Sequence, residues 1–222
     1  MDIAILGGTG DIGEGLALRL TADTSHEVLI GSRDAEKAET KAGEYTTELD
    51  SRGLDREVTG HENVAAVERA DVVVLAVPPY HVGDTVEEVA DALDDGDILV
   101  SPATGMKRDE DGFHYHKPGA GSVTRIVADA APEGVAVVGA FHNLAAGRLA
   151  NLDAELGIDT LVIGDDGDAK GIVTDIAEGI EGLRALDAGG LANAPEIEGL
   201  TPLLINVASN NAGFHDLGIR FR

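Results

Sequence analysis

A glycine-rich turn near the N-terminus constrains the fold more than any other feature of the chain. The apolar segment Asp2–Leu6 predicts a short buried strand, and Gly8, Gly10 and Gly13 follow it in a G-x-G-x-x-G pattern. A helical pattern begins at Glu14. A strand, a glycine turn and a helix in this order predict a dinucleotide site of the Rossmann type. The alternative is a glycine turn that only packs.

The glycines of this turn suit a dinucleotide for mechanical reasons. One permits the tight turn, one lets the backbone approach a pyrophosphate, and one allows the helix to pack closely on the strand. The N–H groups of the first helical turn then point at the anion. The expected cofactor contacts of the turn are Gly8, Thr9, Gly10, Asp11, Ile12 and Gly13.

The end of the second predicted strand, 27–31, indicates NADP rather than NAD. It is followed by Ser32 and Arg33, where an NAD-selective site usually places a carboxylate on the ribose 2′-hydroxyl. Asp34 is typical of a helix N-cap, which puts Lys37 in a first turn that disfavours a cation unless an anion binds there. The pocket expected for the 2′-phosphate consists of Thr9, Ser32, Arg33 and Lys37. The alternative is a solvated arginine and a lysine paired with glutamate on an exposed helix face.

Short apolar runs alternate with helical patterns along the rest of the chain, as in a parallel sheet with crossover helices. Further strands are expected at 71–77, 97–101, 134–140, 160–163 and 183–186, and helices at 34–50, 82–93, 122–131, 169–180 and 195–211. The pattern predicts an α/β fold of the Rossmann type, with a doubly wound, mostly parallel sheet and a small C-terminal lobe. We expect an NADP-binding domain over residues 1–140 and the lobe over residues 141–222.

Three predicted strand ends should converge where ligands bind, beyond the carboxyl ends of the strands. They are followed by residues 78–81, 102–105 and 141–143. We expect Val77 and Pro78 to contact the cofactor. His142 is the ionisable side chain that directly follows the last of these strands, within reach of whatever the nicotinamide reduces. The alternative is a histidine that packs and hydrogen-bonds locally.

The loop at 106–121 carries a basic and aromatic cluster that suits closure over an anionic substrate. A mobile surface loop is the default interpretation of this segment. His114 and His116 lack a third ligand at convincing spacing, so we expect no metal site.

The charge of the chain excludes one class of partner. Only 16 basic residues stand against 41 acidic ones, which gives a formal net charge of -25. A polyanion would be repelled on approach, so we expect no nucleic-acid partner. Molar salt shortens the Debye length to about 3 Å and removes most of the self-repulsion. The acidic surface is therefore typical of a protein from a salt-loving cytosol, and the alternative is an ordinary acidic enzyme.

The chain has no cysteine, which excludes disulfides, zinc-thiolate sites and thiol nucleophiles. No apolar run reaches the roughly 18 residues of a membrane span, and the first strand begins too early for a signal peptide. We therefore expect a cytoplasmic protein without a membrane partner. An apolar face on the last predicted helix suits a homodimer; its residues are Leu200, Leu203, Leu204 and Val207.

Seven short stretches, spread over nearly the whole chain, form a recognisable set. They are Gly7–Gly13, Gly31–Arg33, Phe141–Arg148, Ala150–Asp153, Leu186–Gly189, Leu200–Leu203 and Leu217–Arg220. The chain resembles, through these stretches, the archaeal NADPH-dependent reductases of coenzyme F-420, an 8-hydroxy-5-deazaflavin. The glycine motif is shared by many families, whereas the stretch around His142 and the region 187–203 are more particular.

The resemblance implies an oxidoreductase that transfers a hydride reversibly between NADP(H) and coenzyme F-420. It implies that the backbone at Leu144 and Ala146 fixes the nicotinamide carboxamide, and that His142 and Leu217 line a deazaflavin pocket completed by the C-terminal lobe. Hydride transfer between two stacked rings depends on orientation more than on acid–base chemistry. We therefore expect His142 to position a ring rather than to transfer a proton.

Two alternatives remain open at this point. The first is an NADPH-dependent reductase of another acceptor, such as a flavin, a ferric chelate or an imine. The second is a non-catalytic NADP-binding sensor, which would bind NADPH tightly without turnover.

Overall fold

The computed structural model describes residues 1–222 and confirms the α/β prediction. Its main sheet has eight strands, and a separate hairpin forms a two-stranded sheet. The strands are β1 (Asp2–Leu6), β2 (Glu27–Ser32), β3 (Val58–Glu62), β4 (Val72–Leu75), β5 (Ile98–Ser101), β6 (Met106–Asp109), β7 (Gly112–Tyr115), β8 (Ala136–Gly139), β9 (Ile158–Gly164) and β10 (Leu183–Asp187). The helices are α1 (Asp11–Asp23), α2 (Ala35–Ser51), α3 (Asn63–Val67), α4 (Val82–Val89), α5 (Val123–Ala130), α6 (Ala146–Ala150), α7 (Gly167–Gly179), α8 (Ala194–Glu198) and α9 (Leu200–Asn210).

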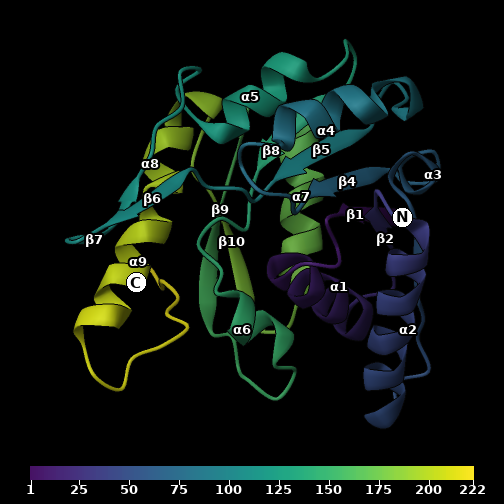
Figure 1. Ribbon diagram of the computed structural model, residues 1–222, viewed down its shortest axis with the longest axis horizontal. Coiled ribbons are helices and arrows are strands. Elements are labelled where there is room, and N and C mark those ends of the chain that lie inside the picture. Colours follow the sequence, from purple (N-terminus) through teal and green to yellow (C-terminus); the bar gives the residue numbers. More distant parts are fainter.

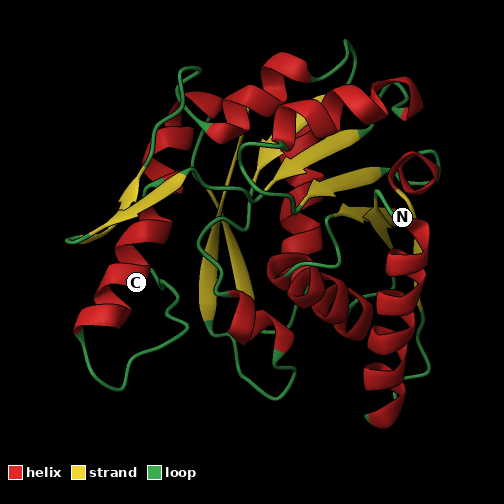
Figure 2. Cartoon of the chain, viewed as in Figure 1, coloured by secondary structure: helices red, strands yellow, loops and turns green.

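The strand order is β10-β9-β8-β5-β4-β1-β2-β3, with helices on both faces of the sheet (Figures 1 and 2). Neighbouring strands are parallel except β8 and β9, which are antiparallel. From β1, the chain first adds β2 and β3 on one side and then returns to add β4 and β5 on the other side, so the direction of strand addition reverses beside β1. In a doubly wound sheet this switch point opens a crevice at the carboxyl ends of the strands, which is where a dinucleotide binds.

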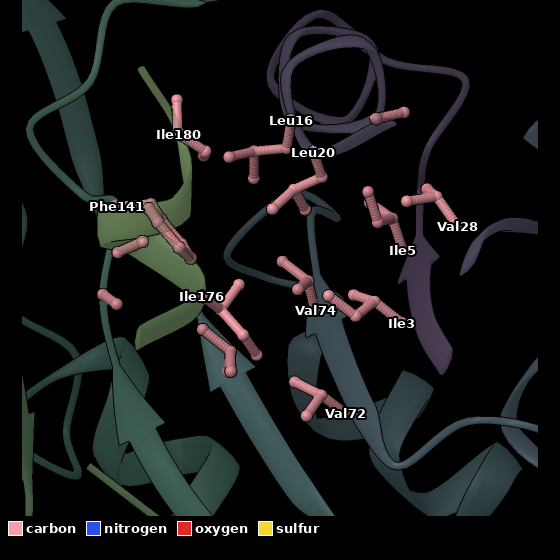
Figure 3. Close-up of a cluster of buried hydrophobic side chains, with 14 of the residues drawn as sticks. Ile3, Ile5, Leu16, Leu20, Val28, Val72, Val74, Phe141, Ile176 and Ile180 are labelled. Atoms are coloured by element: carbon pink, nitrogen blue, oxygen red, sulfur yellow. The ribbon is translucent and has the colours of Figure 1, made fainter. Parts of the chain in front are cut away.

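Two hydrophobic cores lie on the two faces of the sheet because side chains alternate along each strand. In β1, Ile3 and Ile5 join the core under α1, α2 and α7, whereas Ala4 and Leu6 join the core under α3, α4 and α5. Figure 3 shows the first of these cores, in which Leu16 of α1 and Ile176 of α7 meet the strand side chains. Burial on both faces explains why the strands read as continuous apolar runs.

The C-terminal part of the chain first adds two strands to the main sheet and then forms two helices outside the sheet. Strands β9 and β10 and helix α7 share the core of the N-terminal strands. Helices α8 and α9 lie outside the sheet, beside the β6–β7 hairpin (Figure 1). The division of the chain at residue 140 stays a prediction.

Three local predictions were wrong. Strand β3 and helices α3 and α6 were not predicted. β3 is a short edge strand whose side chains are mostly half-exposed and show no apolar run, and α3 and α6 have only five residues each. The expected mobile loop at 106–121 contains the β6–β7 hairpin. The single helix expected at 195–211 is broken after Glu198, because Pro202 has no N–H to donate to the carbonyl of that residue.

Candidate cofactor and substrate site

The glycine turn joins the carboxyl end of β1 to the start of α1, as predicted. Gly7, one residue before the predicted motif, carries the left-handed conformation of the turn with φ +80°. Its N–H donates to the carbonyl of Gly31 at 3.1 Å, which ties the turn to β2. A Cβ on Gly13 would lie 2.5 Å from the Gly7 carbonyl oxygen and 2.6 Å from the Gly8 Cα. The helix can therefore begin against the turn only with glycine at this position.

The N-terminus of α1 is open to an anion. Its N-cap, Gly10, has no side chain to cap the helix, and the N–H groups of Asp11, Ile12 and Gly13 donate to no group of the protein. Unsatisfied N–H groups at a helix N-terminus attract a phosphate, as does the helix dipole. This end of α1 therefore fits the pyrophosphate of a dinucleotide.

Tyr45 supports the turn from α2, and the sequence analysis did not assign it this role. Its hydroxyl donates to the Gly8 carbonyl at 2.9 Å, and the side chain is buried. Burial raises the pKa of the phenol above its ordinary value, so the group stays a neutral donor. Its position in the buried series Ala38, Ala42, Tyr45 and Leu49 indicated only a core residue.

Three of the residues expected at a 2′-phosphate, Ser32, Arg33 and Lys37, lie where β2 ends and α2 begins. Thr9, the fourth, lies in the glycine turn between β1 and α1. The Ser32 hydroxyl accepts from the Asp34 N–H at 3.2 Å, and the Asp34 carboxylate caps α2 by accepting from the Lys37 N–H at 3.2 Å. Arg33 and Lys37 are exposed, and neither side chain forms an ion pair or a hydrogen bond within the chain. The glutamate pairing of the alternative is thus absent from Lys37.

Val77 lies against the glycine turn, after the end of β4. The Cγ1 atom of Val77 would lie 3.0 Å from a Cβ placed on Gly7, and the Ala76 carbonyl oxygen would lie 2.5 Å from it. Pro78 follows Val77 and is exposed. The end of β4 therefore lies close to the turn, as expected from the strand order β4-β1-β2.

A cavity of about 520 Å³ lies where the chain leaves β8. Its lining residues come from the segment after β8, from α9 and from the C-terminal segment: Asn143, Leu144, Ala145, Ala146, Gly147, Thr201, Leu204, Ile205, Ala208, Ser209, Phe214, His215, Asp216 and Leu217. Most of them are apolar, and the volume is within the usual range for a small-molecule site. The cavity contains Leu144, Ala146 and Leu217, three residues expected at the nicotinamide and deazaflavin rings.

Phe141 directs the chain into this cavity from β8. Its φ of +66° is left-handed although the side chain is bulky and 2 % exposed. Such a conformation costs about 1–3 kcal/mol and is retained where the surroundings enforce it, commonly at functional sites. The Phe141 N–H donates to the Thr160 hydroxyl at 3.0 Å, and the ring packs near Ile176 and Ile180 of the core (Figure 3).

His142 lies at the predicted strand end, but its side chain is outside the lining of the cavity. The imidazole is buried, and its Nε2 lies 3.2 Å from the Thr124 hydroxyl. Burial lowers the pKa of His142 to about 4, so the ring is neutral at pH 7. Its backbone carbonyl accepts from the Thr201 hydroxyl of α9 at 2.7 Å. The structure therefore places the backbone of this residue, rather than the ring, beside a wall of the cavity.

Glu198 completes this buried polar group, and no pattern in the sequence indicated it. The carboxylate is fully buried and accepts from the backbone N–H groups of Val123 and Thr124 at 3.0 and 2.9 Å. It also accepts from the Thr124 and Tyr115 hydroxyls at 3.0 and 2.9 Å. Burial raises the pKa of Glu198, while these hydrogen bonds oppose that shift. Since the Thr124 hydroxyl donates its one hydrogen to the Glu198 carboxyl oxygen, it accepts from Nε2–H of His142.

A doubly wound sheet with a glycine turn and an open helix N-terminus at its switch point, together with an apolar cavity of small-molecule size, is typical of Rossmann-type oxidoreductases. Comparison with known proteins narrows this class. Residues 2–105 match the model of the family described as NADP oxidoreductase, coenzyme F420-dependent. The chain belongs to the family of F420-dependent NADP reductases.

Curated relatives support this membership over the whole length. The F420-dependent NADP reductase of Methanocaldococcus jannaschii is 40% identical over 93% of this chain and 92% of its own. That of Methanothermobacter marburgensis is 40% identical over 99% of this chain and 97% of its own. The crystal structure of a protein from Arthrobacter sp. FB24, assigned provisionally to the same activity, has a TM-score of 0.80 at 22% identity and covers 100% of this chain and 99% of its own. That likeness supports the fold.

Proposed function

We propose that this enzyme transfers a hydride reversibly between NADP(H) and coenzyme F-420. The observation that carries the proposal is a cavity of small-molecule size where the chain leaves β8, in a doubly wound sheet. The chain is also 40% identical to an F420-dependent NADP reductase. When bound together, nicotinamide and deazaflavin supply the hydride donor and acceptor. The residues of the chain bind and orient the two rings.

The cofactor-binding residues are assigned as part of this proposal. The turn from Gly8 to Gly13 holds the pyrophosphate, the pocket of Thr9, Ser32, Arg33 and Lys37 holds the 2′-phosphate, and Val77 and Pro78 flank the nucleotide. The backbone at Leu144 and Ala146 holds the carboxamide, and Leu217 faces the deazaflavin. This assignment is supported by the open helix N-terminus, the two unpaired cations and the shared cavity.

In this proposal His142 helps to position a bound ring in the cavity through its own backbone, not through its imidazole. Its neutral, hydrogen-bonded imidazole anchors the residue to α5, and Thr201 holds its carbonyl beside the cavity. The His142 imidazole, with a pKa of about 4, binds a proton only at acidic pH. It therefore cannot act as a general acid at pH 7. Positioning and exclusion of water then account for the rate.

The proposal predicts rapid loss of the visible absorption band of oxidised coenzyme F-420 when NADPH and the protein are added in molar salt. NADPH oxidation should match deazaflavin reduction one to one, and NADH at the same concentration should react far more slowly. Turnover with a flavin, ferric chelate or imine but not with coenzyme F-420 would favour the first alternative. Tight NADPH binding without turnover of any acceptor would favour a sensor.

We further propose a homodimer formed through α9. Leu203 and Val207 of this helix are 55% and 41% exposed, and an exposed apolar helix face is typical of a protein interface. Leu203→Asp should therefore convert a dimer to a monomer in sedimentation equilibrium at molar salt. Tyr80→Asp, at an exposed aromatic residue elsewhere on the surface, should leave the mass unchanged. A monomeric wild-type protein would contradict the proposal.

Three further expectations stay predictions. A cytoplasmic location is checked by cell fractionation, a salt-loving origin by the salt dependence of unfolding, and a domain boundary at residue 140 by limited proteolysis. No helix of the structure has the length and apolar character needed to cross a membrane.

A further inference from the structure

The last residues of the chain, 212–222, form one wall of the cavity without belonging to a helix or a strand. This C-terminal segment turns back after α9 (Figure 1). Its residues Phe214–Leu217 line the cavity. From residue 212 to His215, no hydrogen bond joins the segment to another element, and Phe214 and His215 are exposed. The hydrogen bonds that attach this segment to the sheet are made by the residues that follow.

Asp159, at the start of β9, holds the end of this segment. Its carboxylate is buried and accepts from the Phe221 N–H at 2.7 Å, and its own N–H donates to the Ile219 carbonyl at 2.7 Å. The main-chain bond belongs to an antiparallel bridge between Asp159 and Ile219, and the side-chain bond holds the chain two residues further on, at Phe221. They place Leu217 two residues before a fixed point on the sheet.

Arg184 of β10 completes the attachment. Its Nε and Nη2 atoms donate to the two Asp159 carboxylate oxygens at 2.9 and 2.7 Å, and Nη2 also donates to the Phe221 carbonyl at 2.7 Å. The guanidinium beside Asp159 holds the pKa of that carboxyl below its ordinary value. The carboxylate is thus paired and charged at neutral pH, as a buried acceptor of several hydrogen bonds must be.

Weaker contacts extend the attachment toward the cavity. Arg220 donates to the Gly157 carbonyl at 3.2 Å, and Arg148 of α6 reaches the Asp216 carbonyl at 3.5 Å. Gly218 packs directly against the side chain of Ile158, where a Cβ would collide with it. Residues 216–221 are thus held by contacts with α6 and with β9 and the residues before it, whereas residues 212–215 have no such contacts.

We propose that Asp159 is a positioning residue for the acceptor site. By fixing Ile219 and Phe221 to β9, it holds Leu217 against the cavity that receives the deazaflavin ring, without touching the ring itself. The glycine turn and the 2′-phosphate pocket lie on β1 and β2, away from this attachment, so the phosphate contacts of NADPH do not depend on it. This inference rests on the proposed function, because it takes coenzyme F-420 as the occupant of the cavity.

The test compares Asp159→Asn with the matched variant Asp153→Asn in the full-length protein. Asp153 is also paired with an arginine, Arg52 at 2.7 Å, but it is 79% exposed, and no hydrogen bond or ion pair joins it to the C-terminal segment. A second variant ending at Gly218 removes the attachment while keeping Phe214–Leu217 and the Asp159–Arg184 pair. Three quantities are measured for each variant: the Kd for oxidised coenzyme F-420, the Kd for NADPH, and amide hydrogen exchange over residues 212–218.

Asp159→Asn and the shortened chain should each raise the Kd for coenzyme F-420 by about tenfold, the equivalent of roughly 1.4 kcal/mol. Amide exchange over 212–218 should become faster. The Kd for NADPH should stay within about twofold, since its phosphate groups are bound by elements that the attachment does not touch. Asp153→Asn should change none of the three. In a steady-state assay the KM for the deazaflavin should rise more than kcat falls.

Three results would overturn the inference. An equal rise of both Kd values would show a general loss of structure, and unchanged exchange would show that Asp159 does not hold the segment. Faster exchange with an unchanged Kd for coenzyme F-420 would show that the wall takes no part in binding. Failure of the proposed function is distinguishable, because the wild-type protein itself would then not bind coenzyme F-420.

Discussion

Gly13→Ala should lower the affinity for NADPH on the order of 100-fold, because the added methyl group cannot be accommodated without moving the turn that binds the pyrophosphate. Its Cβ would lie 2.5 Å from the Gly7 carbonyl oxygen and 2.6 Å from the Gly8 Cα, both of them backbone atoms. Helix α1 would have to shift away from the turn, and its free N–H groups would shift with it. Overpacking of this kind also costs about 1–3 kcal/mol of the free energy of unfolding.

Gly43→Ala is the matched control for this substitution. Gly43 lies in α2, and no atom is within 4 Å of a Cβ built there. Alanine should therefore stabilise the protein by about 0.5–1 kcal/mol and leave NADPH binding unchanged. Calorimetric titration with NADPH and denaturant unfolding at constant salt measure both effects. Unchanged NADPH affinity in Gly13→Ala would contradict the assignment of this turn as the pyrophosphate site.

Arg33→Ala should remove most of the preference for NADPH over NADH. A charge-assisted hydrogen bond to a phosphate contributes about 1.5–3 kcal/mol, which corresponds to a rise of the NADPH Kd by roughly 10- to 100-fold. The Kd for NADH should change little, since NADH has no 2′-phosphate. Arg33→Lys should retain part of the preference as a point charge without the planar fork of donors.

Arg69→Ala is the control for a general change of charge, because Arg69 is exposed and forms no ion pair or side-chain hydrogen bond. It should leave the ratio of the two Kd values unchanged. The effect of Arg33→Ala should shrink as salt is raised from about 0.1 M to 1 M, where the Debye length falls from about 10 to 3 Å. A preference that survives Arg33→Ala at low salt would locate the phosphate elsewhere.

Local patterns predicted the elements that carry the proposed NADP half of the site. The glycine turn, the apolar strands and the Asp34 cap each depend on neighbours within a few residues, so the sequence determined them directly. The same reasoning missed Gly7 as the left-handed residue of the turn, because three glycines close together all permit it. It also missed Tyr45, whose partner is the carbonyl of a residue on another element.

The arrangement of residues around the cavity, the proposed acceptor half of the site, depends on the order of the strands. His142 was predicted at a strand end from its position in the sequence, but the burial of its ring follows from the packing of α5 and α8 around it. Asp159 holds Phe221, which lies 62 residues further along the chain. A hydrophobic pattern identifies a strand and its buried faces, but it carries no distance between two polar groups on different elements.

The sequence by itself determined the fold class, the glycine turn and the cationic end of β2, because each arises from contacts that are local in the chain. Only the tertiary structure decided which residues form the cavity, that the imidazole of His142 faces inward, and that the C-terminal segment is attached through Asp159. These features arise from hydrogen bonds between distant segments. Such bonds form only after the sheet has brought β8, β9 and β10 side by side.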